Sequence, residues 1–330
     1  MKKLYSVFML MLALAACSSP GDRLKVDVSD IGMPETVIRR YDRDLFRLNT
    51  TDLKNELEQL KSQYPFFLKT NLDSMKILAM RDYLENERNK AFFRASDSVF
   101  RDMSEVSSGL TDAFRHMAYY FKGFKAPRVY SYISGGDYQY PVQFADSVLL
   151  IAIDCYLGKG CYLYKDDQLP LYRERRADRV YIVSDAMGAI FSAVCPSDFP
   201  GNTLLDQMIQ AGKRILFIDA MMPETSGFVK MGYTKEQYEW AAKNEEHVWA
   251  AIIGNNLLYN TSGQTMRTFL SDGPFTAEFS KESPPRLGEY IGWRILLQYM
   301  ERNPKVSLLE ILKERDGQKL LTGSAYKPQK

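Results

Sequence analysis

The chain has 330 residues, 45% of them hydrophobic and 25% charged, so it is long enough to bury a sizeable core and has a globular composition. Its 43 basic and 41 acidic residues give a net charge of +2, which falls to zero when the two lysines of the leader are removed. A nucleic-acid-binding protein would carry an excess of basic residues, so this balance argues against that class.

The first residues form a secretion signal. Two lysines precede an apolar run from Leu4 to Ala16, which is shorter than the roughly 20 residues of a transmembrane helix. The run ends in LAAC, the form of a bacterial lipobox. We therefore predict a signal peptide over residues 1–16 and a lipid anchor on Cys17; an ordinary signal peptide that contains a cysteine is the alternative. No acidic residue follows Cys17 at once, which favours the periplasmic face of the outer membrane.

Residues 17–35 are predicted to form the lipidated cysteine and a flexible tether, and residues 36–330 a single periplasmic domain. Ile38 to Phe46 begins the fold. Apolar residues at helical spacing then predict several amphipathic helices before residue 123. These helices cover Thr51–Gln63, Leu72–Tyr83, Ala91–Met103 and 110–121.

The pattern changes after Pro127. Arg128–Ser134 and Val142–Asp154 are rich in β-branched and aromatic residues and are separated by a glycine pair, so we predict strands of a small sheet. Cys155 and Cys161 flank the turn YLGKG and could form a disulfide across it in an oxidising compartment. A zinc site is less favoured, because no matching pair of cysteines or histidines exists elsewhere.

Tyr172–Val194 is predicted to be a helix with a charged front half and an apolar back half. Its back half would be buried in the centre of the domain, where the polar atoms of Ser184 and Asp185 need partners. A capping box at Thr203 and Asp206 then begins a helix that ends at Pro223.

A second capping box, at Thr234 and Gln237, begins a helix predicted to run through Trp249 to Leu258. Glu245 shares a face with Trp249 in this helix, which would half-bury its carboxylate. A functional role and a structural salt bridge, for example to Arg294 or Lys213, are both open for Glu245.

The last part of the chain is predicted to be a loop from Asn260 to Ser283, with a short helix at Met266–Leu270, followed by further helices. The loop would expose Phe275 and Phe279. Gly288 and Gly292 would let another helix approach closely, and the tail after Ser324 would fray. Arg286 lies where this loop meets the next helix and could bind a carboxylate.

Five segments point to a family: IRRYDRDLF (Ile38–Phe46), TLLDQMIQAGK (Thr203–Lys213), MGYTKEQYEWAAKNEEHVWA (Met231–Ala250), SPPRLGEYIGWRILLQYM (Ser283–Met300) and QKLLTGSAYKP (Gln318–Pro328). They resemble GldB, the gliding-motility lipoprotein family of Bacteroidetes, over nearly the whole mature chain. That family is distantly similar to predicted zinc metallopeptidases, which carry H-E-x-x-H on a buried helix. This chain has YIVSDAMGAIF in that place, with no histidine.

We therefore expect an α+β fold, predominantly helical with a small β-sheet, distantly metallopeptidase-like without the zinc motif. The first functional hypothesis is a non-catalytic outer-membrane lipoprotein that needs no cofactor and acts through protein–protein interaction in gliding- or secretion-type machinery. The alternative is an envelope hydrolase or peptidase-like enzyme with an unrecognised active site. The candidate groove residues are Asp185, Glu245, Trp249 and Arg286.

Overall fold

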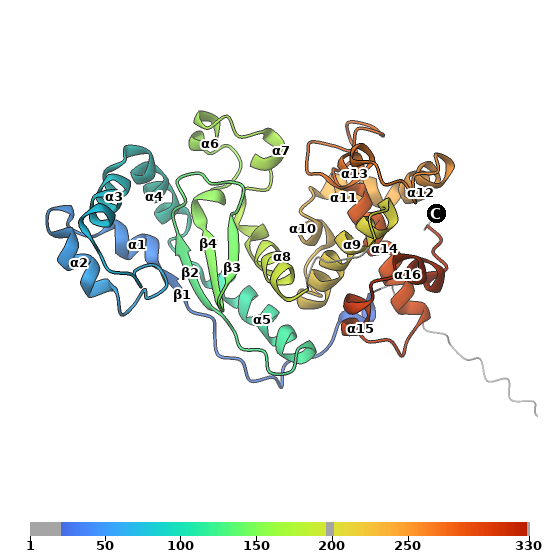
Figure 1. Cartoon of the computed structure of the whole chain (residues 1–330), viewed down its shortest axis with the longest axis horizontal. Coiled ribbons are helices and arrows are strands. Elements are labelled where there is room, and N and C mark those ends of the chain that lie inside the picture. The colour runs from blue at the N-terminus through green and yellow to red at the C-terminus, as the bar shows by residue number, and fades with distance from the viewer. Residues whose placement is uncertain (1–20, 196–200, 329–330) are drawn as a thin grey trace, which may run out of the picture.

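The computed structural model describes residues 21–195 and 201–328, so Cys17 lies outside the described residues. Helices flank a small sheet on both sides (Figure 1), which confirms the predicted α+β, mostly helical fold. Among the described residues, no helix combines the length and the apolar character that crossing a bilayer requires.

The sheet has the strand order β1-β2-β4-β3. Its strands are β1 (Ile38–Arg40), β2 (Arg128–Tyr132), β3 (Val142–Ala145) and β4 (Val148–Ala152). β1, β2 and β4 run parallel, and β3 is the antiparallel edge strand. The predicted single strand over 142–154 is therefore wrong: Asp146 and Ser147, at φ of 50° and 60°, turn the chain into a hairpin.

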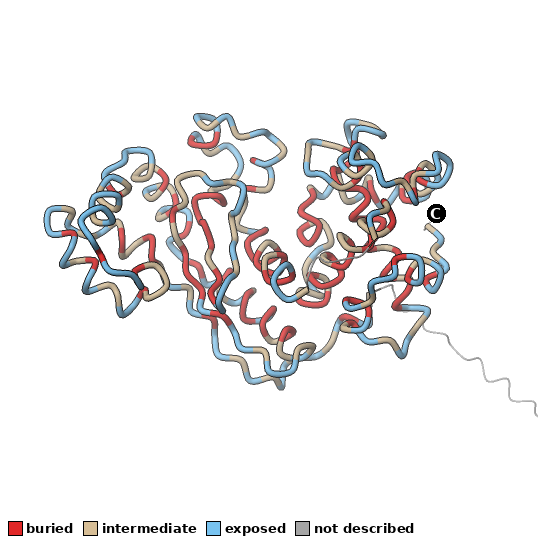
Figure 2. Tube along the Cα trace, in the orientation of Figure 1, coloured by how far each residue is buried: buried red, intermediate tan, exposed pale blue. Residues whose placement is uncertain are grey.

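Both faces of the sheet are covered. Tyr130 and Val148 face a smaller core under the N-terminal helices, whereas Val129 and Leu149 face the main core. Burial on both faces accounts for the continuous apolar run of β4 (Figure 2). The N-terminal helices are α1 (Tyr41–Phe46), α2 (Leu53–Leu60), α3 (Ser74–Glu85) and α4 (Glu87–Val99).

The other face of the sheet packs on α5 (Ser104–Tyr120) and α8 (Ile182–Val194). The short helices α6 (Tyr162–Asp166) and α7 (Leu171–Glu174) lie between β4 and α8 in the chain. The C-terminal helices follow: α9 (Leu204–Met221), α10 (Gly227–Met231), α11 (Lys235–Lys243), α12 (Glu245–Gly254), α13 (Gly263–Leu270), α14 (Leu287–Arg302), α15 (Leu308–Lys313) and α16 (Gly317–Ser324).

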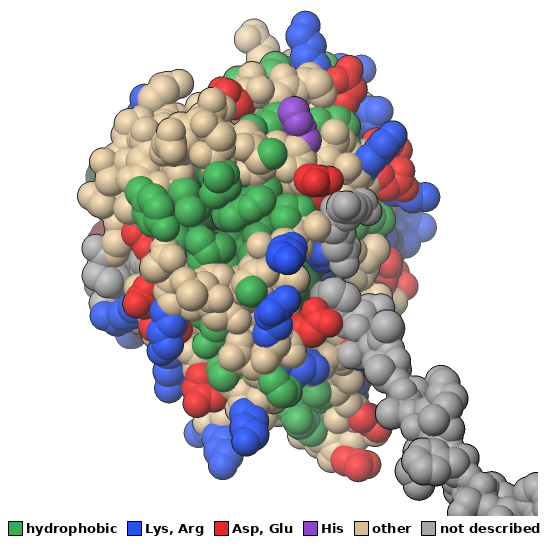
Figure 3. Space-filling model, turned by 90° about the vertical axis from the view of Figure 1, so that its right-hand side faces the viewer, with side chains coloured by type: hydrophobic (Ala, Val, Ile, Leu, Met, Phe, Trp, Pro, Cys, Tyr) green, Lys and Arg blue, Asp and Glu red, His purple; other side chains and the backbone are tan. Residues whose placement is uncertain are grey.

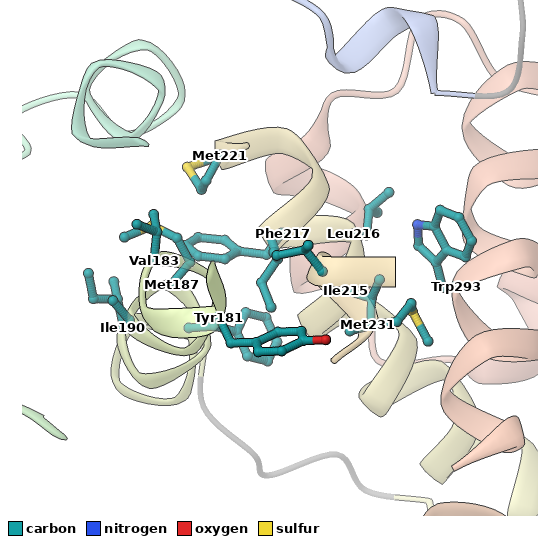
Figure 4. Close-up of a cluster of buried hydrophobic side chains, with 14 of the residues drawn as sticks. Tyr181, Val183, Met187, Ile190, Ile215, Leu216, Phe217, Met221, Met231 and Trp293 are labelled. Carbon is teal, nitrogen blue, oxygen red and sulfur yellow. The ribbon is translucent and has the colours of Figure 1, made fainter. Parts of the chain in front are cut away.

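α9 is the central helix of the main core. Figure 4 shows Phe217 of α9 pointing toward Val183 and Met187 of α8, with Trp293 of α14 on the other side of α9. Glycine lets α9 and α14 touch: a Cβ on Gly292 would lie 1.8 Å from the carbonyl oxygen of Met208. The close internal packing predicted for this glycine is confirmed.

Two predicted helices are each divided. The charged front half of 172–194 is not one helix with α8, because Asp178 forms a bridge with Leu157 and accepts a hydrogen bond from the backbone N–H of Val180. The helix that begins at Thr234 ends at Lys243, and α12 starts after Asn244. Both predicted capping boxes are present.

The first and last described residues are packed on the domain, at positions where the sequence predicts a tether and a frayed tail. Leu24 is only 1% exposed, and Nη2 of Arg23 donates to the carbonyl oxygens of Pro304 and Val306, each at 2.9 Å. At the other end, the Tyr326 hydroxyl donates to Oε1 of Glu245 at 2.8 Å. A few long-range contacts hold each end, by Arg23 and Leu24 at one and by Tyr326 and the backbone of Lys327 at the other, and composition alone does not reveal them.

Candidate functional site

A cavity of about 410 Å³ lies between the start of β3, α8 and the loop that precedes α14. Its lining is rich in charge. The charged residues that line it are Arg173, Arg176, Asp185, Arg214, Asp272 and Arg286. Two of the predicted groove residues, Asp185 and Arg286, therefore contribute to one site.

One face of α8 forms a wall of the cavity. Asp185, Gly188, Ala189 and Ser192 recur at helical spacing and line it, so small side chains leave the space open. A Cβ on Gly188 would lie 3.0 Å from Nη1 of Arg214. This guanidinium therefore approaches the helix at the one position where a side chain is missing.

A buried carboxylate orients two of the arginines. Nη2 of Arg214 donates to Oε1 of Glu289 at 2.8 Å, and Nη1 of Arg286 donates to Oε2 at 2.8 Å. Burial alone would raise the pKa of Glu289, but the two guanidinium groups outweigh it and lower this pKa. Burial likewise opposes the charge of Arg286, but Glu289 and other neighbours raise its pKa overall. Glu289 and Arg286 are therefore held as ions.

Asp185 is engaged by protein groups on both oxygens. Nη2 of Arg176 donates to Oδ1 at 2.9 Å, and the Tyr156 hydroxyl donates to Oδ2 at 2.7 Å. Burial, followed by the charge of Asp185, raises the pKa of Tyr156 well above its ordinary value, so this phenol stays a donor. Asp185 thus serves to orient Arg176 beside the cavity.

The arginines keep unused donors. Nε of Arg176 and Nε of Arg286 are buried and make no hydrogen bond within the described structure, although Nε of Arg286 forms an ion pair with Oδ1 of Asp272 at 3.7 Å. Arg173 is exposed, and its side chain has no hydrogen bond or ion pair to any residue in 21–195 or 201–328. Guanidinium groups match the geometry of carboxylates and other oxyanions, so the cavity suits an anionic group.

The described residues were also searched for a metal-binding group and for disulfides. The part of the chain that the structure describes holds no group of three or more His, Cys, Asp or Glu side chains that could bind a metal ion. Cys155 and Cys161 are free thiols, so the disulfide that the sequence allows is not formed in this structure. Cys155 lines the cavity, and burial raises the pKa of its thiol, which keeps it protonated.

Glu245 and Trp249 belong to a second, separate cluster. Oε2 of Glu245 pairs with Nε of Arg294 at 2.9 Å and accepts a hydrogen bond from the Tyr290 hydroxyl at 3.2 Å. The ring of Trp249 meets that of Tyr326 edge-on at 5.0 Å. The predicted salt bridge to Arg294 is confirmed, and neither Glu245 nor Trp249 lines the cavity.

Four residues that the site uses, Arg173, Arg176, Arg214 and Glu289, were not singled out from the sequence. The available signal was a charge inside an apolar helix, as in KRILF around Arg214 and LGEYIG around Glu289. Phe279, predicted to be exposed, is half-buried against Trp240.

Comparison with protein families finds that residues 21–328 match the family described as gliding motility protein GldB. The match covers nearly the whole chain, so the chain belongs to this family. It is therefore a gliding-motility-associated protein by family, and the resemblance seen in the sequence is confirmed. Comparisons with curated proteins and with solved structures find no match.

Proposed function

We propose that this member of the gliding motility protein GldB family is a non-catalytic envelope lipoprotein that binds a partner protein through its arginine-lined cavity. Cys17 carries the lipid anchor and holds the protein at the periplasmic face of the outer membrane. The partner presents an acidic group to the cavity. The protein needs no cofactor for this role.

The observation that carries the proposal is the arrangement of the arginines around Glu289. Arg214 and Arg286 are fixed in place by one buried carboxylate, which removes most of the conformational freedom that a free arginine would lose on binding. Arg173, exposed and unpaired within the described residues, adds a further positive charge. A preorganised set of this kind favours recognition of an anion.

The alternative of an enzyme receives less support from the same cavity. Both oxygens of Asp185 already accept hydrogen bonds from Arg176 and Tyr156, which makes this carboxylate a poor general base. The Cys155 thiol is held protonated by burial and is a weak nucleophile.

The test is affinity capture of the lipidated protein from detergent-solubilised envelope, followed by mass spectrometry. Arg173→Glu reverses an exposed charge in the cavity lining, so we expect about tenfold less captured partner, while the fold is kept. Arg175→Glu is the matched control, since Arg175 is exposed two residues away and does not line this cavity. Equal capture by both variants, or no specific partner with the wild type, would overturn the proposal.

A further inference from the structure

We propose that the C-terminal end of the molecule rests on the bilayer, through an apolar patch on α12 and the segments beside it. This α12 patch consists of Trp249, Ile253, Leu257, Tyr259 and Tyr326. The ligand of this surface is the interfacial region of the lipid bilayer. The inference goes beyond partner binding at the cavity and rests on the Cys17 anchor of the proposed function.

After Glu245, Glu246 and His247, α12 is apolar on both its buried and its outer side. After two glutamates it reads HVWAAIIG. Val248 and Ile252 are fully buried, yet Ile253 on the outer side is 45% exposed and Trp249 is half-exposed. A helix that is hydrophobic all round is normally buried in a core or in a membrane. α12 lies at the surface, so the apolar side chains on its outer side face solvent instead of an apolar environment.

The neighbouring segments extend this apolar surface. Tyr259, in the turn after α12, is 60% exposed and donates from its hydroxyl to Gln318 of α16 at 2.6 Å. Tyr326 packs its ring against Trp249. Figure 3 looks at this end of the molecule and shows hydrophobic side chains gathered in one patch. Tryptophan and tyrosine are the residues that concentrate where protein meets the headgroup region of a bilayer.

The position of the chain start identifies the bilayer as the occupant. Residues 22–24 are fixed to the C-terminal helices, because Arg23 binds the carbonyl oxygens of Pro304 and Val306 and Leu24 is buried. From Cys17 to Gly21 the chain can span at most about 14 Å. Figure 1 shows α12, α15 and α16 at one end of the molecule and α2 and α3 at the other. A lipid on Cys17 therefore holds the end that carries the α12 patch against the membrane.

The experiment uses the full lipidated protein in vesicles whose phospholipids carry bromine near the headgroup or near the chain end. Bromine quenches tryptophan only on close approach. We expect bromine near the headgroup to remove up to about a third of the emission, the share of one tryptophan among the three in the chain. The Trp249→Phe variant should lose this quenching, and bromine near the chain end should quench less.

Two further variants locate the contact. Ile253→Asp places a charge in the patch and should reduce the quenching at least about twofold. Leu78→Asp is the matched control, because Leu78 is 49% exposed on α3, at the opposite end of the molecule, and should leave quenching unchanged. Quenching that is absent, that persists in Trp249→Phe, or that Leu78→Asp reduces equally would overturn the inference.

Vesicle flotation of the wild type and of Cys17→Ser separates the two proposals. If the wild type floats, the variant does not, and Trp249 stays unquenched, the anchor stands and the α12 inference alone is overturned. The α12 inference is also overturned if Ile253→Asp abolishes capture of a protein partner without any quenching of Trp249, since the patch is then a protein contact. If the wild type fails to float, the anchor is wrong and the inference falls with it.

Discussion

Two buried carboxylates meet arginines at α14, and they differ in what surrounds the ion pair. Glu289 is 4% exposed and binds Arg214 and Arg286, whereas Glu245 is 1% exposed and binds Arg294. The arginines around Glu289 border an open cavity. The cluster around Glu245 is closed by side chains, with two tyrosine hydroxyls completing its hydrogen bonds.

This difference shows what separates a binding site from a structural ion pair. Burial and an arginine partner are common to both carboxylates, so neither property identifies a site. What distinguishes the Glu289 cluster is that both of its arginines line a cavity of about 410 Å³, whereas neither Glu245 nor Arg294 lines it. At Glu245, both carboxylate oxygens accept hydrogen bonds from phenols of the protein itself. The Glu245 cluster binds the C-terminal segment through Tyr326, and the Glu289 cluster orients two arginines that line the cavity.

Removing each charge gives the largest contrast between the two clusters. Glu289→Gln takes the shared carboxylate from the buried Arg286 and the half-buried Arg214 and leaves only Asp272 near Arg286, so we expect the free energy of unfolding to fall by about 3 kcal/mol. Glu245→Gln affects one arginine and keeps an acceptor for the tyrosines, so its loss should be about half as large. Urea unfolding at neutral pH measures both. An equal loss in the two variants would contradict the assignment of Glu289 as the shared counter-ion.

Lowering the pH should also reduce the free energy of unfolding, by less than Glu289→Gln does. The pKa of Glu289 in the folded protein is lowered from its ordinary 4.5, since Arg214 and Arg286 outweigh the effect of burial. Ion pairing therefore stabilises the fold fully above about pH 4.5, where the unfolded carboxyl is already ionised, and this stabilisation is lost as the pH falls through the lower folded-state pKa. Urea unfolding across this range should show the gap between wild type and Glu289→Gln narrowing toward acid pH. A constant gap would mean that the charge of Glu289 is not the source of its stabilising effect.

Local signals in the sequence were sufficient for part of this arrangement. The capping boxes at Thr203 and Thr234 lie within four residues each, and both are present. The pair between Glu245 and Arg294 was among the predicted alternatives, because each residue stands out as a charge on an apolar helix face.

The Glu289 cluster could not be assembled in the same way. Arg214 of α9 and Glu289 of α14 lie 75 residues apart in the chain, and their encounter depends on the close contact of α9 with α14 at Gly292. A long-range contact also explains why one helix prediction was wrong. The pairing of Leu157 with Asp178 interrupts the helix predicted over 172–194, although its composition favours a helix.

The smallest predicted effect concerns the closure of the Glu245 cluster. Tyr326→Phe removes the hydroxyl that donates to Oε1 of Glu245 at 2.8 Å, and should cost about 1.5 kcal/mol because the acceptor is charged. Tyr290→Phe removes a longer bond, of 3.2 Å, and should cost less. Urea unfolding gives both values, and limited proteolysis of the tail gives an independent measure.

Only Tyr326→Phe should expose the segment after Ser324 to protease, since Tyr290 lies within α14. The phenyl ring that remains in this variant can still pack on Trp249, so the release should be partial. If the tail is cleaved equally fast in the wild type, the hydroxyl does not hold it, and Glu245 would then resemble Glu289 as a carboxylate whose surroundings are open to a ligand.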